Sequence, residues 1–162
     1  MIELDKEFFN QDTIKVARSL VGKILQVDNI KARIIEIEAY KDDNASHART
    51  KTPRSKIMYD TYGHIYVYLI YGMYHCLNIT TDSKPGAVLI RAIDYPDCDG
   101  PGKLCQKLNI TKKDNGAALG MRFRILDDDF KPKILRSERI GIKQDKHLKW
   151  RFYTRDIKQL RK

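Results

Sequence analysis

Residues 64–81 read HIYVYLIYGMYHCLNITT, a run rich in β-branched and aromatic side chains in which Gly72 is the only glycine. Such residues favour strands, and a glycine inside the run is typical of a tight turn between two of them. We therefore predict a long β-hairpin with Tyr71, Gly72 and Met73 at its tip. A hairpin of this length favours a fold built mainly on antiparallel strands.

Apolar segments on both sides of the hairpin supply the other predicted strands. Residues 23–27 (KILQV) and 30–40 (IKARIIEIEAY) flank an Asp28-Asn29 turn, and Pro85-Gly86 leads into residues 87–93 (AVLIRAI). Residues 111–137 have a mixed composition, from which we assign no element.

Cap and turn residues predict three short helices. The first is capped by Asp12, buries Ile14, Ala17, Leu20 and Val21 and ends at Gly22; the second begins at Thr52-Pro53; the third is opened by residues 99–102 and carries Leu104 and Leu108. The 162 residues suffice for one core. We predict an α+β fold, a single domain over residues 1–162 with a mainly antiparallel curved sheet, short helices and a protruding hairpin.

The charge of the chain is concentrated near its end. The sequence has 31 Lys and Arg against 21 Asp and Glu, a net charge of +10, and residues 131–162 hold 12 of the cations and 3 of the acids. Such an excess indicates a polyanionic partner, most often nucleic acid. Apolar residues in the same region need contacts, so we expect residues 136–154 to fold with a basic outer face; these apolar residues are Ile140, Ile142, Trp150 and Phe152.

Several other classes of protein are disfavoured. No apolar run approaches the roughly 18 residues that span a bilayer, and the start MIELDKEFFN is acidic where a signal peptide is basic. We therefore expect an intracellular protein with no membrane contact. Three cysteines without a C-x-x-C pair disfavour disulfides, and the four histidines show no metal-ligand spacing, so neither a metal nor a cofactor is predicted.

The strand predicted over residues 30–40 carries the first candidate for chemistry. Side chains alternate along a strand, so one face receives Ile35, Ile37 and Ala39 and the other receives Glu36, Glu38 and Tyr40. Two carboxylates beside an aromatic ring suit base chemistry on a planar substrate. A strand face turned to solvent also often carries glutamate, and the pattern alone does not separate the two interpretations.

Tyrosines cluster in the hairpin. Six of the nine fall within 16 residues, namely Tyr59, Tyr62, Tyr66, Tyr68, Tyr71 and Tyr74. Tyrosine is a favoured strand residue, which accounts for most of them. A ring at the hairpin tip has little protein to pack against, so Tyr71 is a candidate wedge between base steps that fills the gap left by an extruded nucleotide.

Four more polar residues are candidates, each with a structural alternative. Arg91 interrupts an apolar strand and either pairs with a structural carboxylate or meets Glu38 across the sheet. Asn78 either bonds the backbone or reads a base edge, and His47 lies in a polar loop, where most histidines are simply exposed. Lys103 closes a Gly-Pro-Gly-Lys segment at a predicted helix start, where backbone amides can meet a phosphate.

These residues by themselves leave two further functions open. A non-catalytic nucleic-acid-binding module would use the tyrosine hairpin as a stacking platform. A metal-dependent nuclease would use Glu36, Glu38 and a histidine.

Several segments, taken in chain order, resemble one family. They are RIIEIEAY (33–40), ASHART (45–50), TPR (52–54), IYVYLIYGMYHCLNI (65–79), AVLIRA (87–92), GPGKLCQKLNI (100–110), RIGI (139–142) and RFY (151–153). Together they are similar to the alkylpurine (3-methyladenine) DNA glycosylase family of the alkyladenine type, in order over roughly residues 13–153.

The resemblance implies a role for each matched residue. Glu38 would be the general base, with Arg91 and the main-chain carbonyl of Ile140 holding the attacking water. Tyr40, His47 and Tyr68 would bind the flipped base, and Asn78 would screen its substituents. Tyr71 would intercalate into the DNA. Apart from the resemblance, Met73 at the hairpin tip and Lys103 at the predicted helix start are further candidate DNA contacts.

The implied activity is that of a monofunctional, metal-independent DNA glycosylase in base excision repair. The sequence carries no signal of oligomeric state, and a monomer is the default expectation. The glycosylase would flip alkylated or deaminated purines, of the 3-methyladenine, 7-methylguanine or hypoxanthine type, out of double-stranded DNA and hydrolyse the N-glycosidic bond. In a bacterium it would act in the cytoplasm or nucleoid. Only eight residues separate Arg91 from Gly100, where relatives carry a longer insertion, so the range of lesions stays open.

Overall fold

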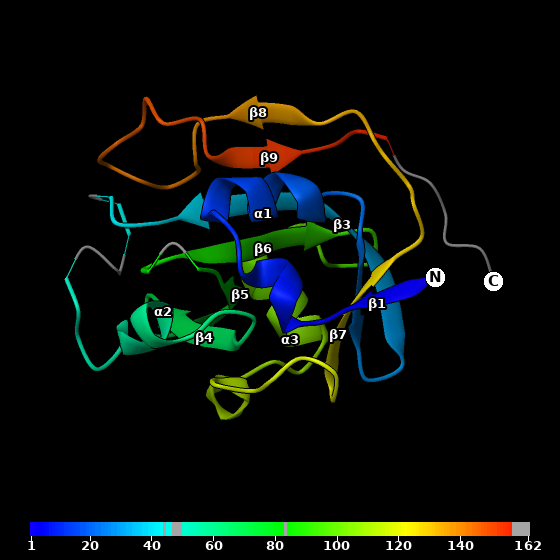
Figure 1. The fold of residues 1–162 in the computed structure, drawn as a ribbon, viewed down its shortest axis with the longest axis horizontal. Helices are drawn as coiled ribbons and strands as arrows, with labels where there is room; N and C mark the ends of the chain where they lie inside the picture. Colours follow the sequence, from blue (N-terminus) through cyan, green and yellow to red (C-terminus); the bar gives the residue numbers. More distant parts are fainter. Residues whose placement is uncertain (44, 47–49, 83, 157–162) are drawn as a thin grey trace.

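The strands form one curved, antiparallel sheet (Figure 1). The computed structural model describes residues 1–43, 45–46, 50–82 and 84–156. Within these residues the strands are β1 (Ile2–Leu4), β2 (Ile24–Val27), β3 (Ile30–Tyr40), β4 (Ile65–Ile70), β5 (Tyr74–Thr80), β6 (Ala87–Ile93), β7 (Phe123–Asp127), β8 (Leu135–Ser137) and β9 (Arg151–Tyr153). The predicted α+β class is confirmed, and β4 and β5 form the predicted hairpin with residues 71–73 at its tip.

Three short helices accompany the sheet in the described part of the chain. They are α1 (Thr13–Leu20), α2 (Lys56–Asp60) and α3 (Pro101–Lys107), with 3-10 turns η1 (Lys6–Phe9) and η3 (Lys112–Asp114). The Asp12 carboxylate caps α1 by accepting backbone N–H bonds, as predicted. Residues 99–102 open α3, also as predicted, and Gly100 is its N-cap.

The predicted start of the second helix is wrong. The structure begins α2 at Lys56, with Ser55 as its N-cap, and not at Thr52-Pro53. The Thr52 hydroxyl accepts a bond from the Ser55 backbone N–H, and the Ser55 hydroxyl accepts one from the Thr52 backbone N–H. This reciprocal pair holds residues 52–55 in a turn, and the helix follows it.

Strand β3 lies at the centre of the sheet. The strand order is β1-β7-β2-β3-β6-β5-β4, so β3 pairs with β6 along one edge. Its other edge is shared, because the first part pairs with β2 and residues 36–38 pair with β9, which in turn pairs with β8. The C-terminal strands are thereby attached to the middle of the chain's longest strand.

The predicted alternation along β3 is wrong at one position, because a β-bulge interrupts the strand there. The pairing with β6 shifts register between Ile34 and Glu36 and again between Glu36 and Ile37. An inserted residue reverses the alternation locally, so Ile34 enters the core in place of Ile35, which is only partly buried. Beyond the bulge, Ile37 and Ala39 enter the core as predicted.

The main core lies between the sheet and two of the helices. Val16, Ala17 and Leu20 of α1 pack with Ile37 of β3 and Phe152 of β9, and Figure 1 shows α1 lying across β3. Leu104 and Cys105 of α3 belong to the same cluster. A smaller cluster of Met58, Tyr66 and Ala87, joined by Tyr40 and Tyr68, lies apart from it.

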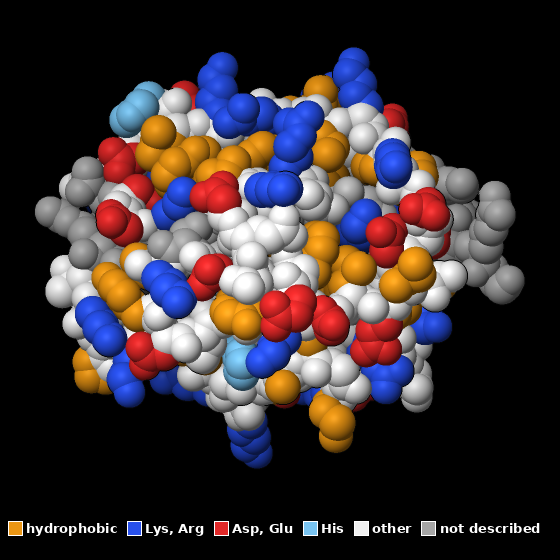
Figure 2. Space-filling model, in the orientation of Figure 1, with side chains coloured by type: hydrophobic (Ala, Val, Ile, Leu, Met, Phe, Trp, Pro, Cys, Tyr) orange, Lys and Arg blue, Asp and Glu red, His pale blue; other side chains and the backbone are white. Residues whose placement is uncertain are grey.

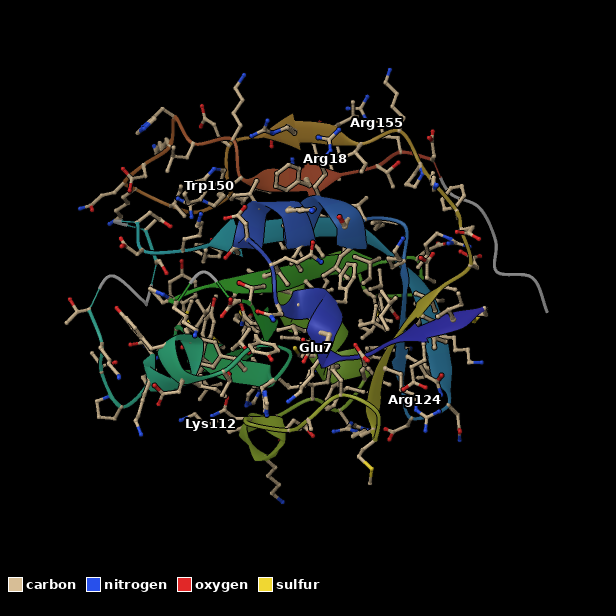
Figure 3. All side chains as sticks on the ribbon, viewed as in Figure 1. Glu7, Arg18, Lys112, Arg124, Trp150 and Arg155 are labelled. Carbon is tan, nitrogen blue, oxygen red and sulfur yellow. The ribbon has the colours of Figure 1, made fainter. Side chains whose placement is uncertain are left out.

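The C-terminal region is folded with a basic outer surface, as predicted. Figure 2 shows Lys and Arg side chains gathering along one edge, over β8, β9 and α1, and Arg18 and Arg155 are labelled there in Figure 3. Phe152 is buried and Trp150 packs on the core. Ile140, expected to pack, is instead 49% exposed, and Arg139 is buried.

The segment that composition left unassigned contains η3, β7 and β8. Strand β7 lies between β1 and β2, and β1 is an additional strand that sequence patterns did not indicate. Both β1 and β8 are only three residues long, too short for a period to be recognised.

Gly22 is required where α1 turns into β2. It has φ +91°, and a Cβ there would lie 2.6 and 2.7 Å from Cδ and Cγ of Pro132, whereas Gly116, with φ +88°, has nothing within 4 Å. We expect Gly116→Ala to cost about 1 kcal/mol for the left-handed backbone. Gly22→Ala should cost about 1–3 kcal/mol more, because of overpacking against Pro132. Urea unfolding of both variants measures the difference, and equal losses would show that the Pro132 contact is unimportant.

Candidate active site

The floor of the candidate site is a row of side chains that crosses four strands. Glu38 of β3 pairs in register with Leu89 of β6, Leu89 with Asn78 of β5, and Asn78 with Tyr66 of β4. Paired residues project from the same face of a sheet, so these four side chains share one face. Their sequence neighbours, including Ile37 and Val88, project into the main core on the other face.

Glu38 is enclosed by hydrogen-bond donors. Its side chain is 0% exposed. Oε1 accepts from the Tyr40 hydroxyl at 2.9 Å and from Nη1 of Arg91 at 3.4 Å. Oε2 accepts from the backbone N–H of Ile140 at 2.6 Å. Strand β6 and the loop before β9 therefore both reach this carboxylate.

The environment of Glu38 raises its pKa. Burial favours the neutral acid, while the charge of Arg91, the N–H of Ile140 and the Tyr40 hydroxyl favour the carboxylate without cancelling the effect of burial. Burial and the adjacent Glu38 charge also raise the pKa of the Tyr40 hydroxyl, which stays a hydrogen-bond donor. A carboxyl group with a raised pKa is suited to accept a proton near neutral pH.

Glu36, two residues earlier, has the opposite environment. Its two oxygens meet Nε of Arg91 at 2.7 Å and Nη2 of Arg151 at 3.1 Å. Burial raises the pKa of Glu36, but the bonds and charges of Arg151 and Arg91 outweigh burial and hold the pKa below its usual value. Both alternatives for Arg91 are realised, since it pairs with a structural carboxylate and also meets Glu38.

A cavity of about 530 Å³ lies over this face of the sheet. Its walls come from the hairpin, from α2 and from two loops. Six residues predicted as functional line it: Tyr40, Tyr68, Tyr71, Asn78, Arg91 and Ile140. Glu38 is directly behind three of them, because Tyr40, Arg91 and Ile140 are its hydrogen-bond donors.

The hairpin tip projects from the rim of the cavity. Tyr71 has φ +53° and is 86% exposed, and Met73 is 65% exposed. Lys103 lies on α3 with its ammonium 3.0 Å from Asp99, and Pro101, at the start of that helix, lines the cavity. His47, the remaining predicted pocket residue, lies outside the described residues.

Of the two alternatives predicted for Asn78, the structure shows the hydrogen bonds to the backbone. Its Nδ2 donates to the backbone carbonyls of Tyr66 at 3.2 Å and Cys76 at 3.4 Å, which fixes the orientation of the amide. The side chain nevertheless lines the cavity, so an amide with a fixed orientation is presented to whatever the cavity holds.

Sequence patterns missed two arginines at the site. Arg54 donates to the Leu69 carbonyl at 3.2 Å and lies 5.2 Å from the Tyr68 ring centre, at the cavity wall. Arg139 is buried and pairs with Asp43. Arg54 and Arg139 belong to the TPR and RIGI segments, so the family resemblance was the one signal that marked them.

Two general properties concern the described part of the chain. No helix there is long and apolar enough to cross a membrane. In the same residues no group of three or more His, Cys, Asp or Glu side chains could hold a metal ion.

Fold and site define a class of protein: an α+β protein with a buried acid behind a tyrosine-lined cavity and an exposed hairpin tip. The sequence matches the family described as Methylpurine-DNA glycosylase (MPG) over residues 7–97 and 95–158. The chain belongs to this family, and the resemblance seen in its motifs is confirmed.

Relatives that are provisionally named 3-methyladenine DNA glycosylases support the assignment. The chain is 40% identical to one from Clostridium novyi (strain NT), with both chains covered completely. It is 45% identical to one from Sodalis glossinidius, over 92% of this chain and 95% of that protein. A third, from Wolbachia pipientis subsp. Culex pipiens (strain wPip), is 43% identical over 92% and 88% of the two chains.

The raised pKa of Glu38 predicts how its charge affects stability. A carboxyl group with a raised folded pKa contributes stability below its ordinary value of 4.5 and loses that contribution as pH rises through the folded pKa. Relative to Glu38→Gln, the free energy of unfolding of the unmodified protein should therefore fall as pH rises from 4.5 through the raised pKa of Glu38. Urea denaturation of both proteins across this range measures the change.

Glu36→Gln is the matched control. Because the pKa of Glu36 is held below its usual value, its contribution is lost only as pH falls toward the acid range. The unmodified protein should thus stay more stable than Glu36→Gln over the whole interval. A difference from Glu38→Gln that does not vary with pH would contradict the environment described for Glu38.

Proposed function

We propose that this protein is a monofunctional DNA glycosylase that flips an alkylated or deaminated purine out of double-stranded DNA and hydrolyses its N-glycosidic bond. The observation that carries the proposal is the buried Glu38 carboxylate, with its raised pKa, behind a tyrosine-lined cavity. Family membership supports the same reaction class. The 3-methyladenine, 7-methylguanine and hypoxanthine types are the proposed substrates, and the protein acts as a monomer without a metal or cofactor.

Binding begins at the DNA backbone. Exposed lysines and arginines, with Lys103 on α3, contact phosphates, so affinity should fall steeply with salt. Tyr71 enters between base steps, with Met73 beside it, and occupies the space of the extruded nucleotide. Unstacking a nucleotide costs a few kcal/mol, and less where pairing is already weakened, which favours damaged bases.

The flipped purine occupies the cavity between the aromatic side chains. Tyr40 and Tyr68 bind its ring, together with His47, and Asn78 screens its substituents. A purine made cationic by alkylation gains cation–π attraction of roughly 0.5–2 kcal/mol over a neutral one. This difference favours the lesion over normal adenine.

Hydrolysis uses Glu38 as the general base. Glu38 takes a proton from a water that Arg91 and the Ile140 carbonyl hold, while the water oxygen forms a bond to C1′. The C1′–N9 bond breaks through an oxocarbenium-like state, and its electron pair stays on the purine. A cationic alkylpurine leaves as a neutral base, and Glu38 gives up its proton to solvent. A neutral purine such as hypoxanthine must also take up one proton from solvent, which balances the proton that Glu38 releases. The products are the free base and an abasic site.

The proposal excludes cleavage of the DNA strand by the protein itself. A bifunctional glycosylase needs an amine that attacks C1′, and no lysine belongs to the described cavity lining. Water is therefore the nucleophile, and strands should break only on later treatment with alkali.

Glu38→Gln tests the general base. Base release from a duplex that carries hypoxanthine or random methylation, measured in EDTA as alkali-dependent breaks, should fall by roughly 10²-fold or more. Binding to the same duplex should persist, because the cavity wall and the exposed cations are unchanged. Glu138→Gln, at an exposed carboxylate two residues before Ile140, should retain activity. Near-normal turnover by Glu38→Gln would disprove the assignment, and binding without any break in the unmodified protein would favour a non-catalytic module.

Tyr71→Ser tests the wedge. Loss of the ring should weaken binding to lesion-containing duplex by about 1–3 kcal/mol, the range measured for base–aromatic stacking. Met121→Ser removes an apolar side chain that is 80% exposed and does not line the cavity, and it should bind normally. The affinities are measured by gel shift or fluorescence anisotropy. An unchanged affinity of Tyr71→Ser for the lesion-containing duplex would refute the role of Tyr71 as the intercalating side chain.

A further inference from the structure

A buried ion pair joins two loops at the cavity. Arg139 lies between β8 and β9, and Asp43 follows β3, 96 residues earlier in the chain. Nη2 and Nη1 of Arg139 lie 2.9 and 3.3 Å from the two carboxylate oxygens of Asp43. The two side chains are 0% and 5% exposed, so this is an interior pair.

Further contacts fix the direction of both side chains. Nη1 of Arg139 also donates to the Ala39 carbonyl at 3.1 Å, and the guanidinium lies 4.8 Å from the Tyr40 ring centre and 5.0 Å from that of Trp150. Figure 3 labels Trp150 where the chain enters β9. The Asp43 carboxylate accepts the backbone N–H groups of Lys41 and Ala45, so it shapes the loop after β3.

The joined loops are those that form the site. Ile140, the residue next to Arg139, donates its backbone N–H to Glu38 at 2.6 Å and lines the cavity with Gly141. Ala45 and Ser46, just beyond Asp43, line the same cavity. The ion pair is thus one residue away from the hydrogen bond between the Ile140 N–H and the Glu38 carboxylate.

Stability alone accounts poorly for this pair. Burying two charges costs several kcal/mol per ion before their attraction is counted, and apolar side chains of similar volume often stabilise a core equally well. Nε of Arg139 is buried and has no hydrogen-bond partner in the described residues, which adds to the cost. A planar guanidinium that contacts a carboxylate, a carbonyl and two rings does, however, fix a geometry that apolar packing would not.

We propose that Arg139 and Asp43 are positioning residues that hold the Ile140 backbone against Glu38 and keep the two cavity loops together. This inference rests on the proposed function, since it assigns the pair to the general base of that reaction. It predicts an effect on the titration of Glu38 that a purely structural pair would not have.

The predicted direction follows from the groups around Glu38. The contact with Ile140 favours the carboxylate, so its loss raises the pKa of Glu38 further. The other charged or titratable groups that face or adjoin Glu38 stay in place: Arg91 of β6, Glu36 and Tyr40 of β3, Tyr68 of β4, Cys76 of β5, and Arg151 of β9 beyond Glu36. In a plot of the rate of base release against pH, the acid limb is the part over which Glu38 becomes ionised. This acid limb should therefore move to higher pH.

Arg139→Lys is the main test, because lysine keeps the charge and loses the planar fork. Carboxyl ¹³C NMR should show the Glu38 signal, identified by its absence in Glu38→Gln, titrating at higher pH than in the unmodified protein. Base release at a pH on the acid limb should fall roughly tenfold, the factor that one hydrogen bond to a charged group provides, and the two rates should converge at high pH. Asp43→Asn, which keeps the shape of the side chain, should shift both readouts in the same direction and serves if Arg139→Lys does not fold.

Arg33→Lys is the matched control, and Arg33 lies in β3, the strand that carries Glu38. Arg33 is 1% exposed, and its Nη1 and Nη2 lie 3.0 and 2.9 Å from the two oxygens of Asp128. Its guanidinium lies 4.4 Å from the Phe130 ring centre, so it resembles Arg139 in burial, pairing and stacking. Arg33→Lys should lose stability without moving the Glu38 titration or the acid limb.

The outcomes separate this inference from the proposed function. If Arg139→Lys and Asp43→Asn lose stability while Glu38 titrates as in the unmodified protein, the positioning role is refuted. If the unmodified protein releases no base but the Glu38 signal shifts in both variants and not in Arg33→Lys, the contact is established and the proposed reaction fails. A shift of the NMR titration together with the acid limb supports both.

Discussion

The burial of one carboxylate constrains the whole site. Glu38 has no exposed side-chain surface, and an isolated charge in such a place would be prohibitively unfavourable. Its compensation comes from three places in the chain: Arg91 on β6, the backbone of Ile140 before β9, and Tyr40 on its own strand. The sheet must therefore bring β6 to one side of β3 and the C-terminal strands to the other, which is the observed strand order.

The bulge in β3 makes this arrangement possible. An extra residue increases local twist and bends the strand, so two different strands can use the same edge of β3. Strand β2 takes the first part, and β9 takes residues 36–38. Pairing with β9 delivers Arg151 to Glu36 and places the loop that holds Arg139 and Ile140 beside Glu38. The displacement of Ile35 from the core is a local consequence of that bend.

Local patterns predicted the parts of the site that depend on period and turn chemistry. Alternation placed Glu36, Glu38 and Tyr40 on one face, and the interrupted apolar run placed Tyr71 at an exposed hairpin tip. No local pattern could pair Asp43 with Arg139 or assign strands of three residues, because these depend on contacts between distant segments. The start of α2 was misplaced for another reason: two hydroxyl side chains formed a turn that competes with a helix cap.

The sequence Glu-Ile-Glu places two carboxylates side by side and leaves the fold to distinguish them. Glu36 meets two guanidinium groups, which hold its pKa low and offset its charge. Arg91 is shared, but its contact with Glu36 is 2.7 Å and its contact with Glu38 is 3.4 Å, so Glu36 takes the closer part of that charge. Glu38 is left deeply buried and only partly compensated, which is why its pKa rises. Two neighbouring acids with pKa values driven apart fit one structural carboxylate and one base.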